Sequence, residues 1–233
     1  KNVYTFPLNN EPKLVNFDYE STWIKKLTFK KPLKELIYQF KNDPDVLGRS
    51  FAMTELVSLV KNENTKGEDK ELIYSAFRNV IESNIYWRMR FNALSQLRNL
   101  LTNASDPNPA KLNEETINML HRVIEKDSAW VLTSALTFLG MTRDTKYADI
   151  YIKGLSNKSE RVVNAYAVAL GKCKSPKAFD ELIKLKDKPS WKNQSLISAL
   201  NGLKELGDPR GAELALTALT DSRSPHWTLA IPV

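Results

Sequence analysis

The segment Arg49-Ser-Phe-Ala-Met-Thr-Glu-Leu56 returns as Arg90-Phe-Asn-Ala-Leu-Ser-Gln-Leu97, 41 residues further along the chain. Its Ala-x-x-x-Leu core recurs at Ala135/Leu139 and Ala199/Leu203, and residues 161–171 carry a shifted version between these two copies. A small residue at a fixed helical position lets two helices approach closely, and a leucine one turn later fills the space between them. Helical units repeated roughly every 30–45 residues predict an α-solenoid, in which each unit buries its apolar face on the next.

Apolar residues recur with a helical period from Pro32 onward. Ala148, Tyr151, Ile152 and Leu155 follow the i, i+3, i+4, i+7 pattern of an amphipathic helix, and breaks such as Asp43-Pro44 and Gly207-Asp-Pro209 separate such segments. We therefore expect an all-α fold of five to six helical hairpins. The pairs are predicted near residues 32–62, 69–101, 114–141, 146–172 and 176–206, with a sixth, incomplete pair from Pro209.

The first 31 residues have a different pattern. Apolar and polar residues alternate at 4–8 and again at 15–19, and Trp23–Phe29 is rich in residues that favour strands. We expect residues 1–31 to form a short β remnant, the end of a β-sandwich module, and residues 32–233 to form the solenoid. Lys1 in place of Met, and an apolar segment that begins at Trp227, lead us to expect a piece cut from a longer chain.

Composition narrows the possible classes. The 233 residues are 42% hydrophobic and carry a net charge of +7, with one cysteine, Cys173. No apolar run approaches the roughly 20 residues of a membrane span, so we expect no membrane partner. A single cysteine excludes a scaffold held by internal disulfides. Between Lys158 and Lys192, nine basic residues face four acidic ones. Such an excess attracts nucleic acid, but acids are interspersed with the lysines, which favours a solvated outer face.

Two sets of residues resemble known families. Leu206–Leu214 and Asp127–Leu136 look like HEAT and HEAT-like repeats. Residues 12–18, 23–30, 35–40 and 45–52 together resemble the junction between the β-sandwich and the C-terminal helical domain in zinc aminopeptidases of the aminopeptidase N family. The resemblance implies a parent protein that binds zinc in a separate catalytic domain and removes amino-terminal residues from peptides. The helical domain would then contact the catalytic domain of the same chain, close its cavity and limit peptide access.

The catalytic residues of that family are absent from this sequence. The helical H-E-x-x-H motif needs two histidines one turn apart, and the chain has only His121 and His226. Arg122 follows His121 where the motif requires Glu, so His121 is interpreted as a packed helix residue. We find no metal-binding, cofactor-binding or catalytic motif and expect no enzymatic activity from this fragment, with zinc confined to the parent catalytic domain.

Three arginines and one tryptophan are the candidate peptide-contacting residues. Arg49 and Arg90 occupy the same repeat position, and Arg161 begins the corresponding helix of a later repeat. The second helix of a solenoid hairpin usually lines the concave face, where a guanidinium group can hold a peptide carboxylate or main-chain oxygens. The alternative is a ladder between repeats with acids such as Asp43, Asp45 or Glu160. Trp87, next to Arg88, is the fourth candidate.

Two other functions stay open on the sequence alone. A free-standing HEAT-repeat scaffold would bind a partner helix or peptide in its groove. A basic nucleic-acid-binding protein would use Trp87-Arg-Met-Arg90 to contact bases and phosphates. Trp87, Trp130 and Trp191 all lie near the predicted start of a second helix, which favours a role in repeat packing and makes nucleic acid the least favoured partner.

Overall fold

The computed structural model describes residues 5–19, 22–24, 29–103, 105–106 and 108–220, with the side chains of 217–220 left out. Within these ranges the chain is all-α, with no β-strand, and its helices pack against one another in hairpins. It forms two compact units, residues 1–100 and 101–233, which are described separately. The predicted all-α, solenoid-like fold of helical hairpins is confirmed.

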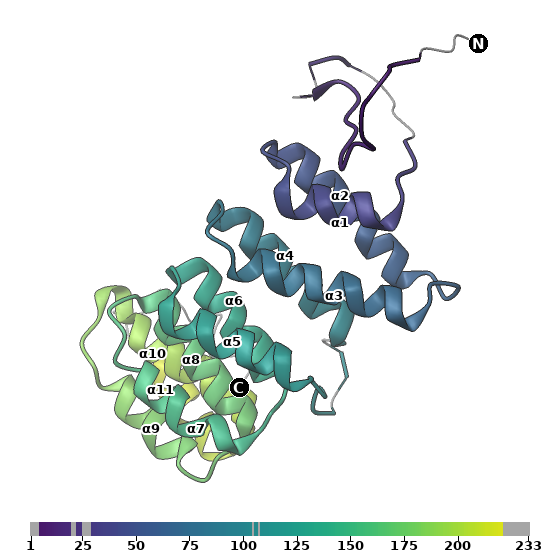
Figure 1. Cartoon of the computed structure of the whole chain (residues 1–233). Coiled ribbons are helices and arrows are strands. Elements are labelled where there is room, and N and C mark those ends of the chain that lie inside the picture. The colour runs from purple at the N-terminus through teal and green to yellow at the C-terminus, as the bar shows by residue number, and fades with distance from the viewer. Residues whose placement is uncertain (1–4, 20–21, 25–28, 104, 107, 221–233) are drawn as a thin grey trace. The chain divides into compact units, whose positions relative to one another are not determined.

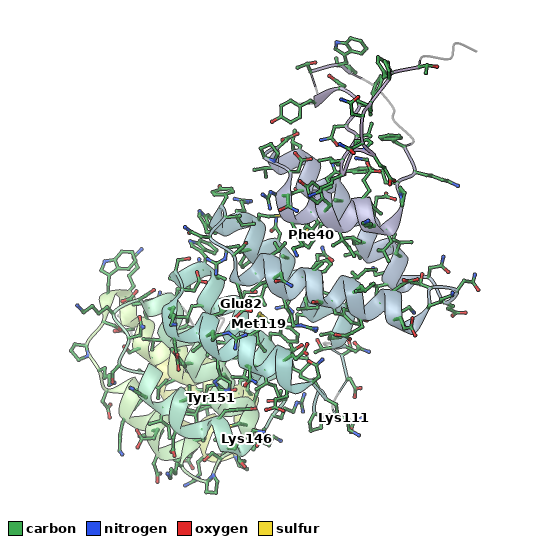
Figure 2. The ribbon with its side chains drawn as sticks, in the orientation of Figure 1. Phe40, Glu82, Lys111, Met119, Lys146 and Tyr151 are labelled. Carbon is green, nitrogen blue, oxygen red and sulfur yellow. The ribbon has the colours of Figure 1, made fainter. Side chains whose placement is uncertain are left out.

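The first unit contains two hairpins (Figure 1). Its helices are α1 (Leu33–Asn42), α2 (Val46–Lys61), α3 (Gly67–Glu82) and α4 (Trp87–Leu101). The Asp45 side chain begins α2 by accepting a hydrogen bond from the Leu47 amide. Helix α1 packs on α2 and α3, and the Phe40 and Phe77 rings meet with their centroids 4.8 Å apart in the core (Figure 2).

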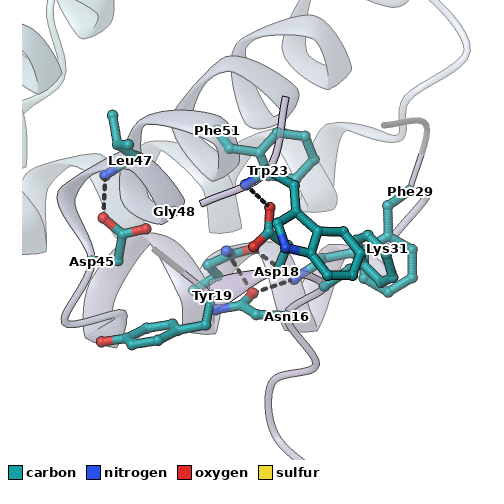
Figure 3. A pocket seen from close by; sticks show the side chains of 12 residues that line it. Asn16, Asp18, Tyr19, Trp23, Phe29, Lys31, Asp45, Leu47, Gly48 and Phe51 are labelled. Carbon is teal, nitrogen blue, oxygen red and sulfur yellow. Dashed lines mark hydrogen bonds between the residues drawn. The ribbon is translucent and has the colours of Figure 1, made fainter. Parts of the chain in front are cut away.

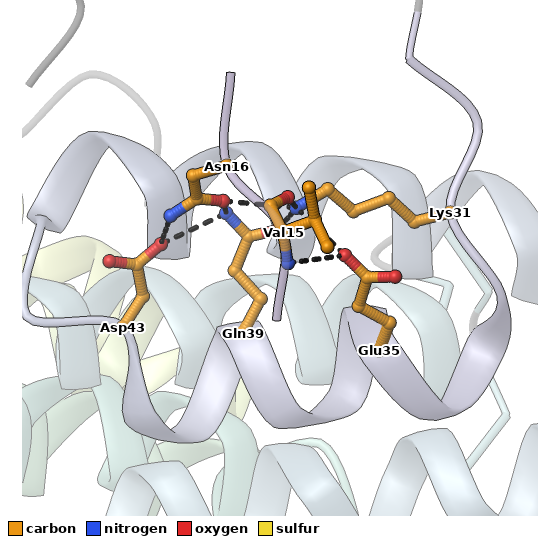
Figure 4. Close-up of polar contacts among 6 residues, drawn as sticks. All are labelled: Val15, Asn16, Lys31, Glu35, Gln39 and Asp43. Atoms are coloured by element: carbon orange, nitrogen blue, oxygen red, sulfur yellow. Dashed lines mark hydrogen bonds and ion pairs between the residues drawn. The ribbon is translucent and has the colours of Figure 1, made fainter. Parts of the chain in front are cut away.

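The residues before α1 lie along that helix, but not as strands. Described residues of 5–31 contain no β-strand, so the predicted strands at 6–8 and 15–19 are wrong there, while Tyr4 and residues 25–28 lie outside the described residues. The reason is visible at Val15. Its amide donates to Glu35 Oε1 at 3.0 Å and its carbonyl accepts from Lys31 Nζ at 2.6 Å (Figure 4). Side chains at α1 therefore use the backbone groups that a neighbouring strand would need.

A buried polar cluster extends this contact. The Lys31 side chain is only 2% exposed, and its ammonium group also donates to Asn16 and Gln39. Gln39 and Asn16 both donate to Asp43 Oδ2, and Asp43 is fully buried at the end of α1 (Figure 4). The cluster places the first segment in the same compact unit as α1. The compact units thus divide at residue 100, and the assignment of residues 1–31 to a sandwich module stays a prediction.

The second unit has two layers of helices (Figure 1). First helices of its hairpins are α5 (Glu114–Lys126), α7 (Ala148–Gly154) and α9 (Ala178–Lys186); second helices are α6 (Ala129–Gly140), α8 (Glu160–Cys173) and α10 (Gln194–Leu206). Short 3₁₀ turns η2 (Thr145–Tyr147) and η3 (Trp191–Asn193) precede α7 and α10, and α11 (Arg210–Thr220) follows. Helix α8 packs between α6 and α10, and buried Met119 and Tyr151 come from α5 and α7 (Figure 2).

The contact between α8 and α10 depends on glycine. A Cβ atom at Gly171 would collide with the backbone oxygen of Gly202, and a Cβ atom at Gly202 would meet the Ala167 oxygen at 2.7 Å. The two helices therefore touch through their backbones. The five hairpins lie where the sequence predicted them, and α11 occupies the predicted start of the sixth, whose remainder lies outside the described residues.

Candidate functional site at the start of the second helices

Arg49 binds within its own hairpin. From α2, its guanidinium donates to the carbonyls of Phe40 at 3.2 Å and Lys41 at 2.7 Å, and to the Asp43 carbonyl. These are the acceptors that the last turn of α1 leaves without helical partners. Burial lowers the pKa of Arg49 and the nearby Asp43 carboxylate opposes this shift, so the side chain stays charged. Arg49 closes the end of a helix.

Arg90 makes the corresponding contact in the second hairpin. Its Nε donates to the Ile81 carbonyl at 2.7 Å, in the last turn of α3. In both hairpins the arginine thus bonds to backbone carbonyls of its own hairpin, and the alternative of a ladder between repeats with acidic side chains stays a prediction. Peptide contact by Arg49 and Arg90 stays a prediction.

Arg161 behaves differently, because it lies over an exposed aromatic ring. Its guanidinium carbon is 3.6 Å from the ring centroid of Trp130, the second residue of α6, which is 44% exposed. This distance is that of a cation–π stack. Trp87, in the first unit, is half-buried and packs edge-on against Tyr86 at 5.8 Å. Peptide contact by Trp87 and Arg161 stays a prediction.

Trp191 and Lys192 repeat the arrangement one hairpin further on. Lys192 Nζ lies 4.4 Å from the centroid of Trp191, which is 69% exposed in η3. Helices α6, α8 and α10 are second helices of successive hairpins, so they run in the same direction and start at one edge of the unit (Figure 1). We call Trp130, Arg161, Trp191 and Lys192 the aromatic–cation edge. It can bind groups with negative charge or flat π surfaces.

The sequence contained part of this signal. It placed Trp130 and Trp191 at the start of second helices and showed the excess of basic residues between Lys158 and Lys192. It did not reveal the left-handed backbone of Lys192 and Asn193, with φ of 48° and 54°, which turns the chain just before α10. Two consecutive non-glycine residues in the left-handed region of backbone conformation are uncommon, and no local sequence pattern predicts them.

A pocket lies in the first unit, among the aromatic residues before α1. It measures about 290 Å³ and is lined by Phe17, Trp23, Phe29 and Phe51 (Figure 3). Phe17 and Trp23 pack edge to face with their centroids 6.3 Å apart. Asp18 fixes the turn that joins them, because its carboxylate accepts from the amide of Thr22 and from that of Trp23, the second bond being drawn in Figure 3. Polar residues such as Asn16, Lys31 and Gln39 complete the walls, and the pocket is open to solvent.

The residues with metal or nucleophile chemistry have structural contacts. The His121 ring packs on Tyr147 at 5.3 Å, and His226 lies outside the described residues. Cys173 is buried, its thiol donates to the Leu170 carbonyl at 3.1 Å, and burial raises its pKa. A raised pKa lowers the fraction of reactive thiolate. The described ranges contain no group of three or more metal-ligating side chains.

Comparison with known proteins adds no family assignment. No family model matches this chain, and no curated protein matches it. Within the described part of the sequence, none of the helices has the length and apolar character needed to cross a membrane.

Proposed function

We propose that this chain is the non-catalytic helical part of a zinc-dependent aminopeptidase, where it closes the catalytic cavity and limits the access of peptides. The resemblance of residues 12–52 to the junction before such a helical domain supports the proposal. The single structural observation that carries it is the segment before α1, which is fixed to that helix by hydrogen bonds of Val15 and Asn16 and also exposes several large apolar side chains.

The segment exposes several large apolar side chains. Phe6, Phe17, Trp23 and Ile24 are 78%, 53%, 68% and 108% exposed. Of these, Phe17 and Trp23 pack against each other, and exposed apolar groups of this kind are typical of contact surfaces between protein parts. Because Lys31 and Gln39 hold the segment to α1, it can join a preceding module to this helix without a flexible hinge. This is what a domain that closes over a catalytic cavity requires.

The chemistry of peptide hydrolysis lies outside the described residues under this proposal. They offer no cluster that fits zinc, so the metal and the water that it activates belong to the parent catalytic domain. The contribution of this chain is the shape and the positive charge of the cavity wall, which select peptides by size and charge.

The experiment is an assay of the complete gene product on aminoacyl-arylamides, with and without a zinc chelator. We expect chelator-sensitive release of the arylamine from the complete product and none from residues 1–233. A Trp23→Ser variant of the complete product should lose thermal stability, whereas Trp191→Ser, at an equally exposed tryptophan of the other unit, should not. A complete gene product without an H-E-x-x-H motif and without activity would contradict the proposal.

The aromatic–cation edge favours a second candidate, a surface that binds an anionic partner such as nucleic acid. Its stacked Trp130–Arg161 and Trp191–Lys192 pairs combine ring faces with positive charge. Retardation of a short single-stranded DNA at low ionic strength, lost on Trp130→Ala, would support this candidate. No retardation at low salt would eliminate it.

A further inference from the structure

The loop between α7 and α8 contains the tripeptide Asn157-Lys158-Ser159. Asparagine followed two residues later by serine, with any residue except proline between them, is the acceptor sequence for N-linked glycosylation. A transferase has to bind such a tripeptide from solvent and reach both the asparagine amide and the serine hydroxyl. Because short patterns of this kind also occur without being used, the local structure decides which copy is accessible.

The structure presents Asn157 to solvent in a defined conformation. Asn157 and Lys158 are exposed, and both lie outside the flanking helices. The backbone amide of Asn157 donates to the Gly154 carbonyl at 3.0 Å, which ties the loop to the end of α7. Asn157 Oδ1 accepts from the Ser159 amide at 2.9 Å, which forms an Asx turn. The amide oxygen is thus bound by the backbone, and Nδ2 is the side-chain atom that a transferase can approach.

The Ser159 hydroxyl is not used by the helix that follows it. A serine that immediately precedes a helix ordinarily caps it, by accepting a hydrogen bond from an amide of the first turn. Ser159 occupies this position before α8, but its side chain makes no such bond, and its backbone is extended with φ of −92° and ψ of 116°. The hydroxyl is therefore available to an enzyme that binds residues 157–159 as an extended segment.

A second copy of the pattern in the same unit has a different geometry. In Asn193-Gln194-Ser195, the last two residues already belong to the first turn of α10. Asn193 is half-buried with a left-handed backbone, and the Ser195 amide donates to Ser190 Oγ at 2.8 Å instead of to Asn193. A transferase could bind this copy only by unwinding the start of α10. The third copy begins at Asn103 and contains residue 104, which lies outside the described residues.

We propose that Asn157 is a site of N-linked glycosylation, which takes an oligosaccharide from a polyprenyl diphosphate donor. In the transfer, Nδ2 forms a bond to the anomeric carbon of the first sugar, and the bond from that carbon to the diphosphate oxygen breaks. The diphosphate leaves with the electron pair of that bond, and the amide proton passes to a base of the transferase. The assignment uses only the loop between α7 and α8, so it is independent of the aminopeptidase proposal.

The cysteine content of the chain is compatible with a compartment in which such transferases act. Cys173 is buried, and the sequence contains no other cysteine with which it could form an internal disulfide. Oxidising conditions therefore leave the covalent structure of the fold unchanged.

The test is mass spectrometry of peptides from the complete gene product, isolated from the cells that naturally make it. Treatment with a peptide-N-glycosidase in ¹⁸O-labelled water should convert Asn157 to labelled aspartate and leave Asn193 unlabelled. Ser159→Ala keeps the backbone bond to Asn157 but removes the hydroxyl, so the glycan should be lost, whereas Ser159→Thr should retain it. Ser195→Ala, the matched change in the second copy, should leave the glycan at Asn157 in place.

The outcomes separate the modification from its alternatives. An Asn157 peptide found only at its unmodified mass would overturn the proposal. Label that appears without the glycosidase, or that persists in Ser159→Ala, would also overturn it, because spontaneous deamidation of Asn157 would then explain the signal. Glycans on both Asn157 and Asn193 would support the site and show that the transferase acts before α10 folds. Thermal unfolding of Ser159→Ala should match that of the unaltered chain, because Ser159 does not cap α8, so loss of the glycan is not a folding defect.

Discussion

Arg49 and Arg90 each donate a hydrogen bond to the carbonyl nine residues earlier, at Phe40 and Ile81 respectively. The two arginines share a position in the sequence repeat, and the structure gives them the same task of closing the C-terminal end of the preceding helix. The repeat thus preserves the joint between the two helices of a hairpin as well as their apolar faces.

Removing the Arg49 contact should destabilise the first unit. Arg49→Met keeps the apolar stem but leaves the carbonyls at the end of α1 without charged donors, so we expect the free energy of unfolding to fall by about 2 kcal/mol. Urea denaturation followed by circular dichroism measures this change. Arg88→Gln is the matched control: Arg88 is exposed at the start of α4, and its effect should stay within about 0.5 kcal/mol. Equal losses in the two variants would contradict the capping role.

The Lys31 cluster predicts a local effect. Lys31→Met leaves the Val15 carbonyl, Asn16 and Gln39 without their shared donor, so the segment before α1 should open more often. Hydrogen exchange at the Val15 amide, which donates to Glu35, should become at least about tenfold faster. Lys30→Met replaces the exposed neighbouring lysine and should leave this rate unchanged. Fast exchange of the Val15 amide in the unaltered chain would contradict the role of the cluster in holding this segment to α1.

Two glycines allow a matched test of the contact between α8 and α10. Gly171→Ala would press a methyl group against the Gly202 backbone, and because neither backbone can move freely we expect a loss of about 2–3 kcal/mol. At Gly67, the first residue of α3, a Cβ atom meets nothing within 4 Å, so Gly67→Ala should stabilise the chain by about 0.5 kcal/mol. Thermal unfolding of both variants measures the pair. Tolerance of Ala at Gly171 would mean that the helices do not approach this closely.

The hairpins could be predicted from the sequence because period and breakers are local signals. The spacing of Ala148, Tyr151 and Leu155, and the Gly207-Asp-Pro209 break, depend on residues close together in the chain. Alternation at Val15 and Phe17 is also local, but a strand exists only when a neighbour pairs with it. Here the neighbour is a helix, and the backbone of Val15 bonds to Glu35 and Lys31 instead.

The candidate sites show the same limit. The sequence identified Arg161 and Trp130 separately, because each stands at the start of a second helix. Their stacking across α8 and α6 depends on how hairpins pack. For Arg49, the sequence suggested acidic or peptide partners, since it could not show that the end of α1 lies within reach.

Tyr151 predicts how stability depends on pH. Burial raises its pKa well above the ordinary value of 10, so the folded chain keeps a proton that the unfolded chain releases. The protonated Tyr151 therefore contributes fully to the free energy of unfolding below about pH 10. As pH rises above this value, that free energy falls by up to about 1.4 kcal/mol per pH unit. Urea unfolding between about pH 8 and about pH 11 should show this fall. Tyr151→Phe should make it shallower, whereas Phe at exposed Tyr86 should not.

The Trp130–Arg161 stack can be measured by a double-mutant cycle with Trp130→Leu and Arg161→Met. Either single change removes the contact, so the two effects should not add. We expect a coupling free energy of about 0.5–1 kcal/mol, the value typical of cation–π pairs at exposed sites. Phe179→Leu combined with Arg161→Met serves as the control cycle, since Phe179 stacks under Arg210 at 3.6 Å and not under Arg161. Coupling near zero in both cycles would mean that the Arg161 side chain is solvated and not stacked on Trp130. It would then be free to bind an anionic partner directly, and a peptide carboxylate should be tested as its ligand before Trp130 is.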